Sequence, residues 1–322
     1  MKIIFYFLLF SLATSALGQN CCTGGSPLAN NLNLSNLDSG LSVQIVFDQN
    51  NMSDFVSNNE ILDDDSYVRY NSSLFFQLSW AIKKDFSLGL MLNHSKHFLK
   101  RKSINVGRET ESKGIGDLVF ITNYNFWQKG KHSAQLGASV VLPTGRNDVK
   151  DKDFDIILPW DLQPAYGGWG GLVMVQYQNG RVLVDNLNYF GLLVYQHLFE
   201  NKKPETSQIF KQGAEYQFYQ GLGYNIFLNQ LVISPQLGLR FRYTNQDRIN
   251  HALVESSGGI WLFNMIGLNV LLSQNLTFMA AYENPIYRNL NGSQLTTSNR
   301  FRVGIHMFFG DKEEQKERTL NF

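Results

Sequence analysis

Residues 68–80 read VRYNSSLFFQLSW, and the alternation of their apolar and polar side chains decides the fold. One face of this segment carries Val68, Tyr70, Leu74, Phe76, Leu78 and Trp80, and the other carries Arg69, Asn71, Ser73, Gln77 and Ser79. A period of two residues predicts a β-strand. The segment runs past the roughly five or six residues of a strand in a soluble sheet. It is long enough for a tilted strand that crosses a membrane in roughly 9–11 residues.

The same alternation recurs along the chain, most clearly in residues 41–48, 230–243 and 300–309. We expect about twelve such strands. They lie near residues 40–49, 67–81, 86–95, 116–127, 132–142, 166–178, 181–198, 209–227, 230–243, 258–272, 275–286 and 300–309. An even number of strands leaves both ends of a bacterial barrel on the periplasmic side of the membrane.

The joints between these strands alternate in length. Short polar turns lie at residues 83–85, 128–131, 179–181, 229–230 and 273–275. Long polar loops lie at residues 49–66, 95–113, 143–163, 200–208, 245–255 and 288–299. Short periplasmic turns and long extracellular loops are typical of outer-membrane proteins. The sequence therefore predicts an all-β fold, a single antiparallel transmembrane β-barrel of about 12 strands with short periplasmic turns and long extracellular loops.

Composition agrees with a barrel and excludes some partners. The 322 residues are 43% hydrophobic and only 17% charged, and Phe (24 residues) and Tyr (14 residues) are abundant, as in β-proteins. The formal net charge of +1 gives no reason to expect a nucleic acid as a partner. Outside the N-terminus the chain has no run of 18 apolar residues, so a helical membrane protein is not expected.

The two ends of the chain indicate how it is exported. Residues 1–18 have the features of a signal peptide: Lys2, then an apolar core at residues 3–12, then small residues at a cleavage site at residues 16–18. We expect residues 19–39 to form a flexible periplasmic segment, residues 40–309 the barrel, and residues 310–322 a polar periplasmic tail. The expected location is the outer membrane of a Gram-negative bacterium, after cleavage of the signal peptide.

Two adjacent cysteines, Cys21 and Cys22, follow the expected cleavage site and are the only cysteines of the chain. Neighbouring cysteines cannot cross-link a fold. They are weak candidates for binding a soft metal such as Cu(I), and the alternative is a flexible segment with reactive or oxidised thiols. We expect no cofactor.

Two stretches of the sequence resemble a known family. They are GIGDL at residues 114–118 and GASVVLPTG at residues 137–145, with a weaker third match at residues 162–170. In these stretches the chain resembles Gram-negative outer-membrane proteins associated with the meta-pathway of phenol degradation, often described as transporters. The resemblance implies a barrel that admits small, often hydrophobic or aromatic molecules. The motifs themselves have a structural explanation, because glycines relieve crowding and Pro-Thr-Gly ends a strand.

Several polar side chains are expected to face the lumen. These candidate lumen-lining or solute-binding residues are Arg69, Asp117, Asn123, Asn125, Glu215, Gln217, Tyr219, Arg240, Arg242, Glu283, Arg302 and His306. Opposed charges in a lumen can form a constriction that orients or filters solutes. The alternative is that the charges pair with one another, hold the interior together and leave it plugged.

One long loop carries an apolar run that water would solvate poorly. It contains Ile156, Ile157, Leu158 and Trp160. We expect these residues to fold into or over the mouth of the barrel as a cap. There they either receive an apolar ligand or pack against neighbouring loops. The basic run at residues 100–102 is a candidate contact for lipopolysaccharide phosphates, with a solvated loop surface as the alternative.

An enzyme is not expected. His94 and Ser95 are adjacent, as are His132 and Ser133, and adjacent residues of a strand point to opposite faces. Such pairs cannot form the hydrogen bond between a nucleophile and its base. The sequence favours a channel or transporter for passive passage of small solutes, with outer-membrane lipid and lipopolysaccharide around it. The alternative is a structural or surface-interaction barrel with a plugged lumen and loops that bind a partner or lipopolysaccharide.

Overall fold

A computed structural model describes residues 40–64, 66–102, 108–203, 205–229 and 231–310. The expected signal peptide, the N-terminal segment with Cys21 and Cys22, and residues 311–322 of the expected tail lie outside the described residues. No helix among the described residues is long and apolar enough to cross a membrane.

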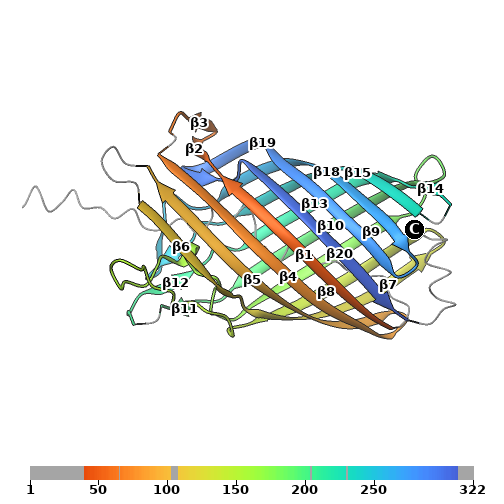
Figure 1. Ribbon diagram of the computed structural model, residues 1–322, viewed down its shortest axis with the longest axis horizontal. Helices are drawn as coiled ribbons and strands as arrows, with labels where there is room; N and C mark the ends of the chain where they lie inside the picture. The colour runs from red at the N-terminus through yellow and green to blue at the C-terminus, as the bar shows by residue number, and fades with distance from the viewer. Residues whose placement is uncertain (1–39, 65, 103–107, 204, 230, 311–322) are drawn as a thin grey trace, which may run out of the picture.

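Within the described residues, twelve antiparallel strands close into one barrel (Figure 1). They are β1 (Gly40–Met52), β4 (Tyr67–Lys83), β5 (Phe86–Arg101), β7 (Leu118–Lys129), β8 (His132–Leu142), β9 (Gly170–Asn179), β10 (Leu187–Leu198), β13 (Glu215–Tyr224), β15 (Leu231–Thr244), β18 (Gly259–Ser273), β19 (Leu276–Thr296) and β20 (Asn299–Phe309). The ring closes because β1 pairs with β4 on one side and with the last strand, β20, on the other. The predicted fold class is confirmed.

The alternation of side chains sorts the two faces of the barrel wall. On β4, Leu74 and Phe76 are 49% and 47% exposed, whereas the intervening Phe75 and the following Gln77 are buried. The exposed members of the pattern point outward and are mostly apolar, which suits contact with lipid. Polar side chains such as Gln77 face inward. The two faces that the sequence predicts are therefore the outer and inner surfaces of the barrel.

Aromatic residues ring the outer surface near both ends of the barrel. Near the short turns, Trp127 stacks on Tyr177, with ring centroids 6.3 Å apart. Near the long loops, Tyr216 lies between Tyr195 and Tyr243, at centroid distances of 4.9 and 5.9 Å. Aromatic girdles of this kind mark the two membrane interfaces of a transmembrane barrel.

The short-turn end of the barrel differs from the prediction at one joint. Three turns are as tight as expected, with only residues 84–85, 130–131 and 274–275 between the strands. The joint after β9 is longer than the expected 179–181, because β10 begins at Leu187 rather than at residue 181. Its apolar residue Leu183 has a positive φ of 65° and is 96% exposed, so it does not continue the strand pattern.

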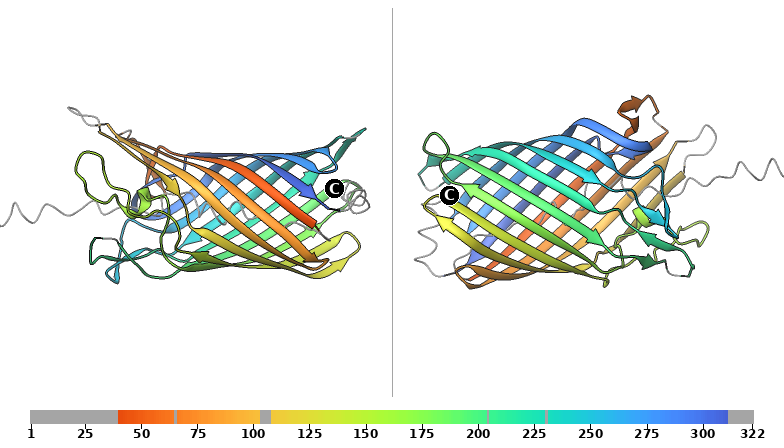
Figure 2. Two further views of the ribbon diagram at one scale, coloured as in Figure 1. Left: turned by 60° about the horizontal axis from the view of Figure 1, so that its bottom comes forward. Right: turned by 180° about the vertical axis from the view of Figure 1, so that it is seen from behind.

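The long-loop end contains more strand than the sequence predicts. β19 continues to Thr296, through most of the expected loop at residues 288–299, because its upper part pairs with β2 (Asp54–Asn58). β3 (Glu60–Leu62) pairs with β2, and β6 (Arg108–Ile115) pairs with the part of β5 nearest the long loops, in line with β7. A separate small sheet joins the loops, made of β11 (Asn201–Lys202), β12 (Ile209–Lys211), β16 (Arg248–Ile249) and β17 (Ala252–Leu253). At the other end, β14 (Ile226–Leu228) continues the line of β13. Figure 2 shows the strands and loops from two further sides.

Candidate functional site in the barrel lumen and its mouth

The lumen contains a set of buried ion pairs centred on Glu283 of β19. Arg240 of β15 donates to Oε2 of Glu283 from Nη2 at 2.6 Å and from Nε at 3.0 Å. Arg302 of β20 donates to Oε1 of the same carboxylate. The side chains of Arg240 and Glu283 are fully buried, whereas that of Arg302 is 14% exposed. One carboxylate is thus shared by two guanidinium groups.

Two further pairs flank this centre. Arg242 donates to Glu215 Oε2 at 2.9 and 3.1 Å, and Arg300 donates to Asp48 Oδ2 at 2.6 Å. The guanidinium carbon of Arg242 lies 4.3 Å from the centre of the Trp261 ring. Charged hydrogen bonds of this kind are stronger than neutral ones, and a cation over an aromatic face is stabilised further.

These ion pairs run along the wall of the barrel. Arg242 and Glu215 lie on neighbouring strands, as do Arg300 and Asp48, and Arg240 and Glu283 are separated by one strand. Together with Arg69 of β4, the arginines form a set that we call the arginine arc: Arg69, Arg240, Arg242, Arg300 and Arg302. Its carboxylate partners come from the same side of the ring or from the mouth.

Part of the inner wall is apolar. Ten buried side chains pack together there, which we call the apolar band: Val46, Phe75, Met91, Val119, Ile121, Val141, Leu172, Met174, Val194 and Leu198. In the ring of strands, β8 lies opposite β19 and β9 lies opposite β20. The part of the band on β8 and β9 therefore lies opposite β19 and β20, whereas Val46 and Phe75 lie on the strands that also carry Asp48 and Arg69.

The mouth of the barrel holds a folded loop, residues 143–169, which we call the mouth loop. It contains one 3₁₀ turn, η2 (Trp160–Leu162). Asp161 of this turn forms an ion pair with Arg69 of β4, and both side chains are buried, at 8% and 3% exposure. Ser112 of β6 donates to the carbonyl of Leu162. These contacts attach the loop to the inner wall.

Apolar packing supports the same attachment. Trp160 stacks on Phe210 of β12 at a centroid distance of 4.9 Å, and Ile157 and Leu158 are buried. Ile156, in contrast, is 66% exposed and takes no part in this packing, unlike the other members of the expected cap.

The neighbouring loop also fastens the mouth loop. Lys203 donates to the carbonyl of Ile157 at 3.3 Å, and partial burial lowers the pKa of Lys203. The Tyr166 hydroxyl donates to the carbonyl of Phe199, and burial raises the pKa of Tyr166. The mouth loop is thus held by the barrel wall on one side and by the loop after β10 on the other.

Asp117, one of the expected lumen residues, contacts the mouth loop. It lies in the break between β6 and β7, and its carboxylate accepts hydrogen bonds from the backbone N–H groups of Gly145 at 2.9 Å and Gly167 at 2.8 Å. A Cβ atom on Gly145 would lie 2.4 Å from the carbonyl carbon of Gly116. The family-like motifs therefore meet at one point, where Asp117 fastens the mouth loop to the strand break.

The remaining candidates occupy the inner wall. Asn123 donates to Ser87 at 3.3 Å, and the Tyr219 hydroxyl donates to Gln217 at 2.5 Å. Asn125 and His306 are half-buried. The sequence-based set omitted Asp48 and Arg300, although the alternation places both on polar faces. It also omitted Asp161, which lies in a loop with no periodic pattern.

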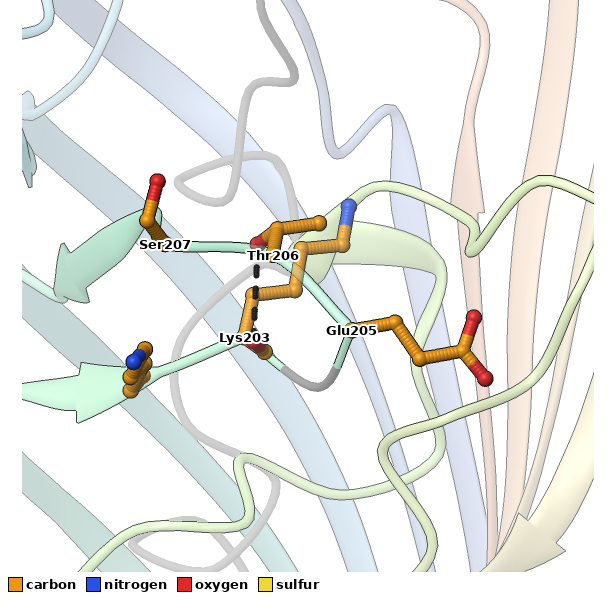
Figure 3. A pocket seen from close by; sticks show the side chains of 5 residues that line it. Lys203, Glu205, Thr206 and Ser207 are labelled. Carbon is orange, nitrogen blue, oxygen red and sulfur yellow. Dashed lines mark hydrogen bonds between the residues drawn. The ribbon is translucent and has the colours of Figure 1, made fainter.

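A pocket of about 510 Å³ lies in the loop between β11 and β12 (Figure 3). It is lined by Lys202, Lys203, Glu205, Thr206 and Ser207. Most of these side chains are exposed, so the pocket is a surface hollow rather than an enclosed site. Among the described residues, no group of three or more His, Cys, Asp or Glu side chains could hold a metal ion.

The barrel is similar to solved outer-membrane barrels. The COG4313 outer membrane channel from Pseudomonas putida F1 has a TM-score of 0.66 at 12% identity, over 85% of this chain and 97% of that one. The beta domain of the Bordetella autotransporter Brka has a TM-score of 0.48 at 12% identity, over 84% and 100%. A Pseudomonas aeruginosa FadL homologue has a TM-score of 0.45 at 12% identity, over 91% and 98%.

At these identities the similarity shows a shared fold, and only the first structure is similar enough to inform it. No protein-family model matches the chain, and no curated protein matches its sequence. The closed barrel, with its apolar outer surface, places the chain in the outer membrane of a Gram-negative bacterium.

Proposed function

We propose that the barrel is a passive channel for small solutes that have a hydrophobic or aromatic body. The observation that carries this proposal is the apolar band inside the lumen. The interior of a transmembrane barrel is ordinarily polar, and here ten apolar side chains gather on part of its wall. The free energy of an apolar solute is lower beside this band than it would be in a lumen lined only by polar groups.

Transport through the barrel involves no chemical step. Solute moves down its concentration gradient, and the inner wall determines which solutes pass. The mouth loop lies in the path at the extracellular end, since Asp161 is bound to the inward-facing Arg69. We therefore assign the loop to the control of access to the lumen.

The test is uptake by proteoliposomes that contain the full chain, with toluene and glycerol as the two probe solutes. We expect toluene to be favoured, and Met174→Gln, inside the band, to reduce that preference. Arg181→Gln is the control, because Arg181 lies at the short-turn end, where it pairs with Asp185. Vesicles with folded protein that pass neither solute faster than empty vesicles would contradict the proposal.

The second candidate is a structural barrel with a closed lumen and loops that bind lipopolysaccharide or a partner. Its support is that the charges of the arginine arc are paired and almost completely buried. The two functions differ in planar bilayers, where a structural barrel gives no conductance and a channel does.

A further inference from the structure

The part of the barrel wall formed by β5 and β6 carries two lysines that lie directly opposite each other (Figure 1). Lys96 of β5 is in register with Lys113 of β6. Their chain neighbours His97 and Ser112 are buried on the inner face, so both lysines point to the outer face of the wall. Like charges in directly opposite positions of a β-sheet destabilise it. The two lysines therefore cost stability unless an anion lies beside them.

The carboxylates of this outer face do not balance its lysines. Glu111 forms an ion pair with Lys96 at 3.0 Å, and Glu109 forms one with Lys100 at 2.7 Å. Lys113 is exposed, and no carboxylate among the described residues forms an ion pair with it. Its charge is therefore the one in excess on this face. Lys100, which belongs to the basic run expected to contact lipopolysaccharide, already has a partner.

Apolar and aromatic side chains lie beside the two opposite lysines on the same outer face. One outer position closer to the short turns, Leu74 of β4 and Ile115 of β6 are 49% and 53% exposed. One outer position closer to the long loops, Tyr70 stacks on Phe98 with ring centroids 4.8 Å apart. The lysines therefore lie where the lipid-facing surface gives way to charged positions, at the level of lipid headgroups.

We infer that the outer face of β5 and β6 binds a phosphate group of lipopolysaccharide between Lys96 and Lys113. Lysine ammonium groups bind phosphate through charge-assisted hydrogen bonds. The acyl chains of the same molecule lie along Leu74 and Ile115. A free phosphate would contact the lysines and leave this apolar surface unused, so the phosphate of a lipid is the better fit. The site lies on the outside of the wall, and it does not depend on whether the lumen conducts.

The position of β6 distinguishes this site from a simple protection of a strand edge. Within the described part of the chain, β6 pairs with β5 alone, and a lysine on such an edge keeps other strands away. That role does not explain Lys96, because β5 is paired on both sides, with β4 and with β6. On its inner face β6 fastens the mouth loop through Ser112. A lipid bound outside thus also holds the strand to which the mouth loop is attached.

The experiment measures the binding of lipid A, the phosphorylated lipid part of lipopolysaccharide, to the full chain in detergent micelles. The two probes are lipid A with two phosphates and the same lipid without phosphate, and we expect the first to bind more tightly. Lys113→Gln should raise the Kd of the phosphorylated lipid by roughly tenfold, the scale of one hydrogen bond to a charged group. It should leave the Kd of the other lipid unchanged. Lys84→Gln, in an exposed turn at the opposite end of the barrel, is the matched control and should change neither.

Each outcome decides the inference. Equal binding of the two lipids by the wild-type protein would overturn it, as would a Lys113→Gln variant that binds phosphorylated lipid A like the wild type. Inorganic phosphate is added as a competitor, and the assignment to a lipid is wrong if it binds as tightly as lipid A. If Lys113→Gln does not fold, Lys113→Arg keeps the charge and should bind like the wild type. The comparison of the two lipids on the wild-type protein then decides.

Discussion

The ion pair between Asp161 and Arg69 is the contact whose loss should open the mouth of the barrel. Asp161→Asn keeps the size of the side chain and the hydrogen bond from Arg69 to the backbone carbonyl of residue 161, but it removes the carboxylate. Arg69 would then carry its charge inside the barrel wall without an ionic partner.

The size of the effect follows from burial. Arg69 and Asp161 are 3% and 8% exposed, and removal of one partner of a buried ion pair costs about 3–5 kcal/mol. Because the backbone hydrogen bond remains, we take the lower end, about 3 kcal/mol, which corresponds to roughly a hundredfold shift in an equilibrium. The equilibrium concerned is that between the attached and the detached mouth loop.

Single-channel recording in planar bilayers measures this shift. We expect a clear increase in open probability for Asp161→Asn. The control in the same loop is Asp148→Asn, because Asp148 and its partner Arg146 are both 60% exposed and such surface pairs contribute little. The reasoning is refuted if Asp161→Asn folds and conducts with the same open probability and conductance as the wild type.

Three further changes test other parts of the structure. Leu237→Arg, on the lipid-facing side of β15, should lower the free energy of unfolding in vesicles by about 2–4 kcal/mol, measured by urea titration, whereas Leu183→Arg in the exposed turn should not. Gly145→Ala would place a Cβ atom 2.4 Å from the carbonyl carbon of Gly116 and should expose the mouth loop to protease. Gly223→Ala should not, because the atom nearest to its Cβ would be a side-chain carbon 3.4 Å away. Glu283→Gln leaves two buried arginines with one partner fewer and should destabilise the barrel by about 3–5 kcal/mol; an unchanged urea midpoint would show that the pairs are not needed.

The barrel could be predicted from the sequence because lipid imposes a simple rule on it. Every second residue of a spanning strand must be compatible with lipid, and the rule is visible in β4 without any tertiary information. The rule stops at the membrane surface. Residues 288–299 are expected to form a loop because the stretch is long and polar, yet Leu290 and Ser293–Thr296 pair with β2 at the long-loop end, where lipid no longer dictates the pattern.

The candidate site was predictable only in part. The alternation identifies which arginines face inward, such as Arg240 and Arg242, but it cannot say with which carboxylate each one pairs. The register and shear of the barrel determine that, and they bring Arg240 to Glu283 across an intervening strand. The partner of Arg69 could not be found in this way, because Asp161 comes from a loop and reaches the wall only after the loop folds.

The ion pair of Arg300 and Asp48 has a consequence for biogenesis, since its members are 252 positions apart and join the last strand to the first. The two charges can meet only after translocation of the whole polypeptide, so this seam forms late and its contact is of the most non-local kind. A chain that ended before β20 would leave the edges of β1 and β19 unpaired there, and exposed strand edges favour aggregation. The barrel can therefore close only after β20 has been synthesised and has paired with β1.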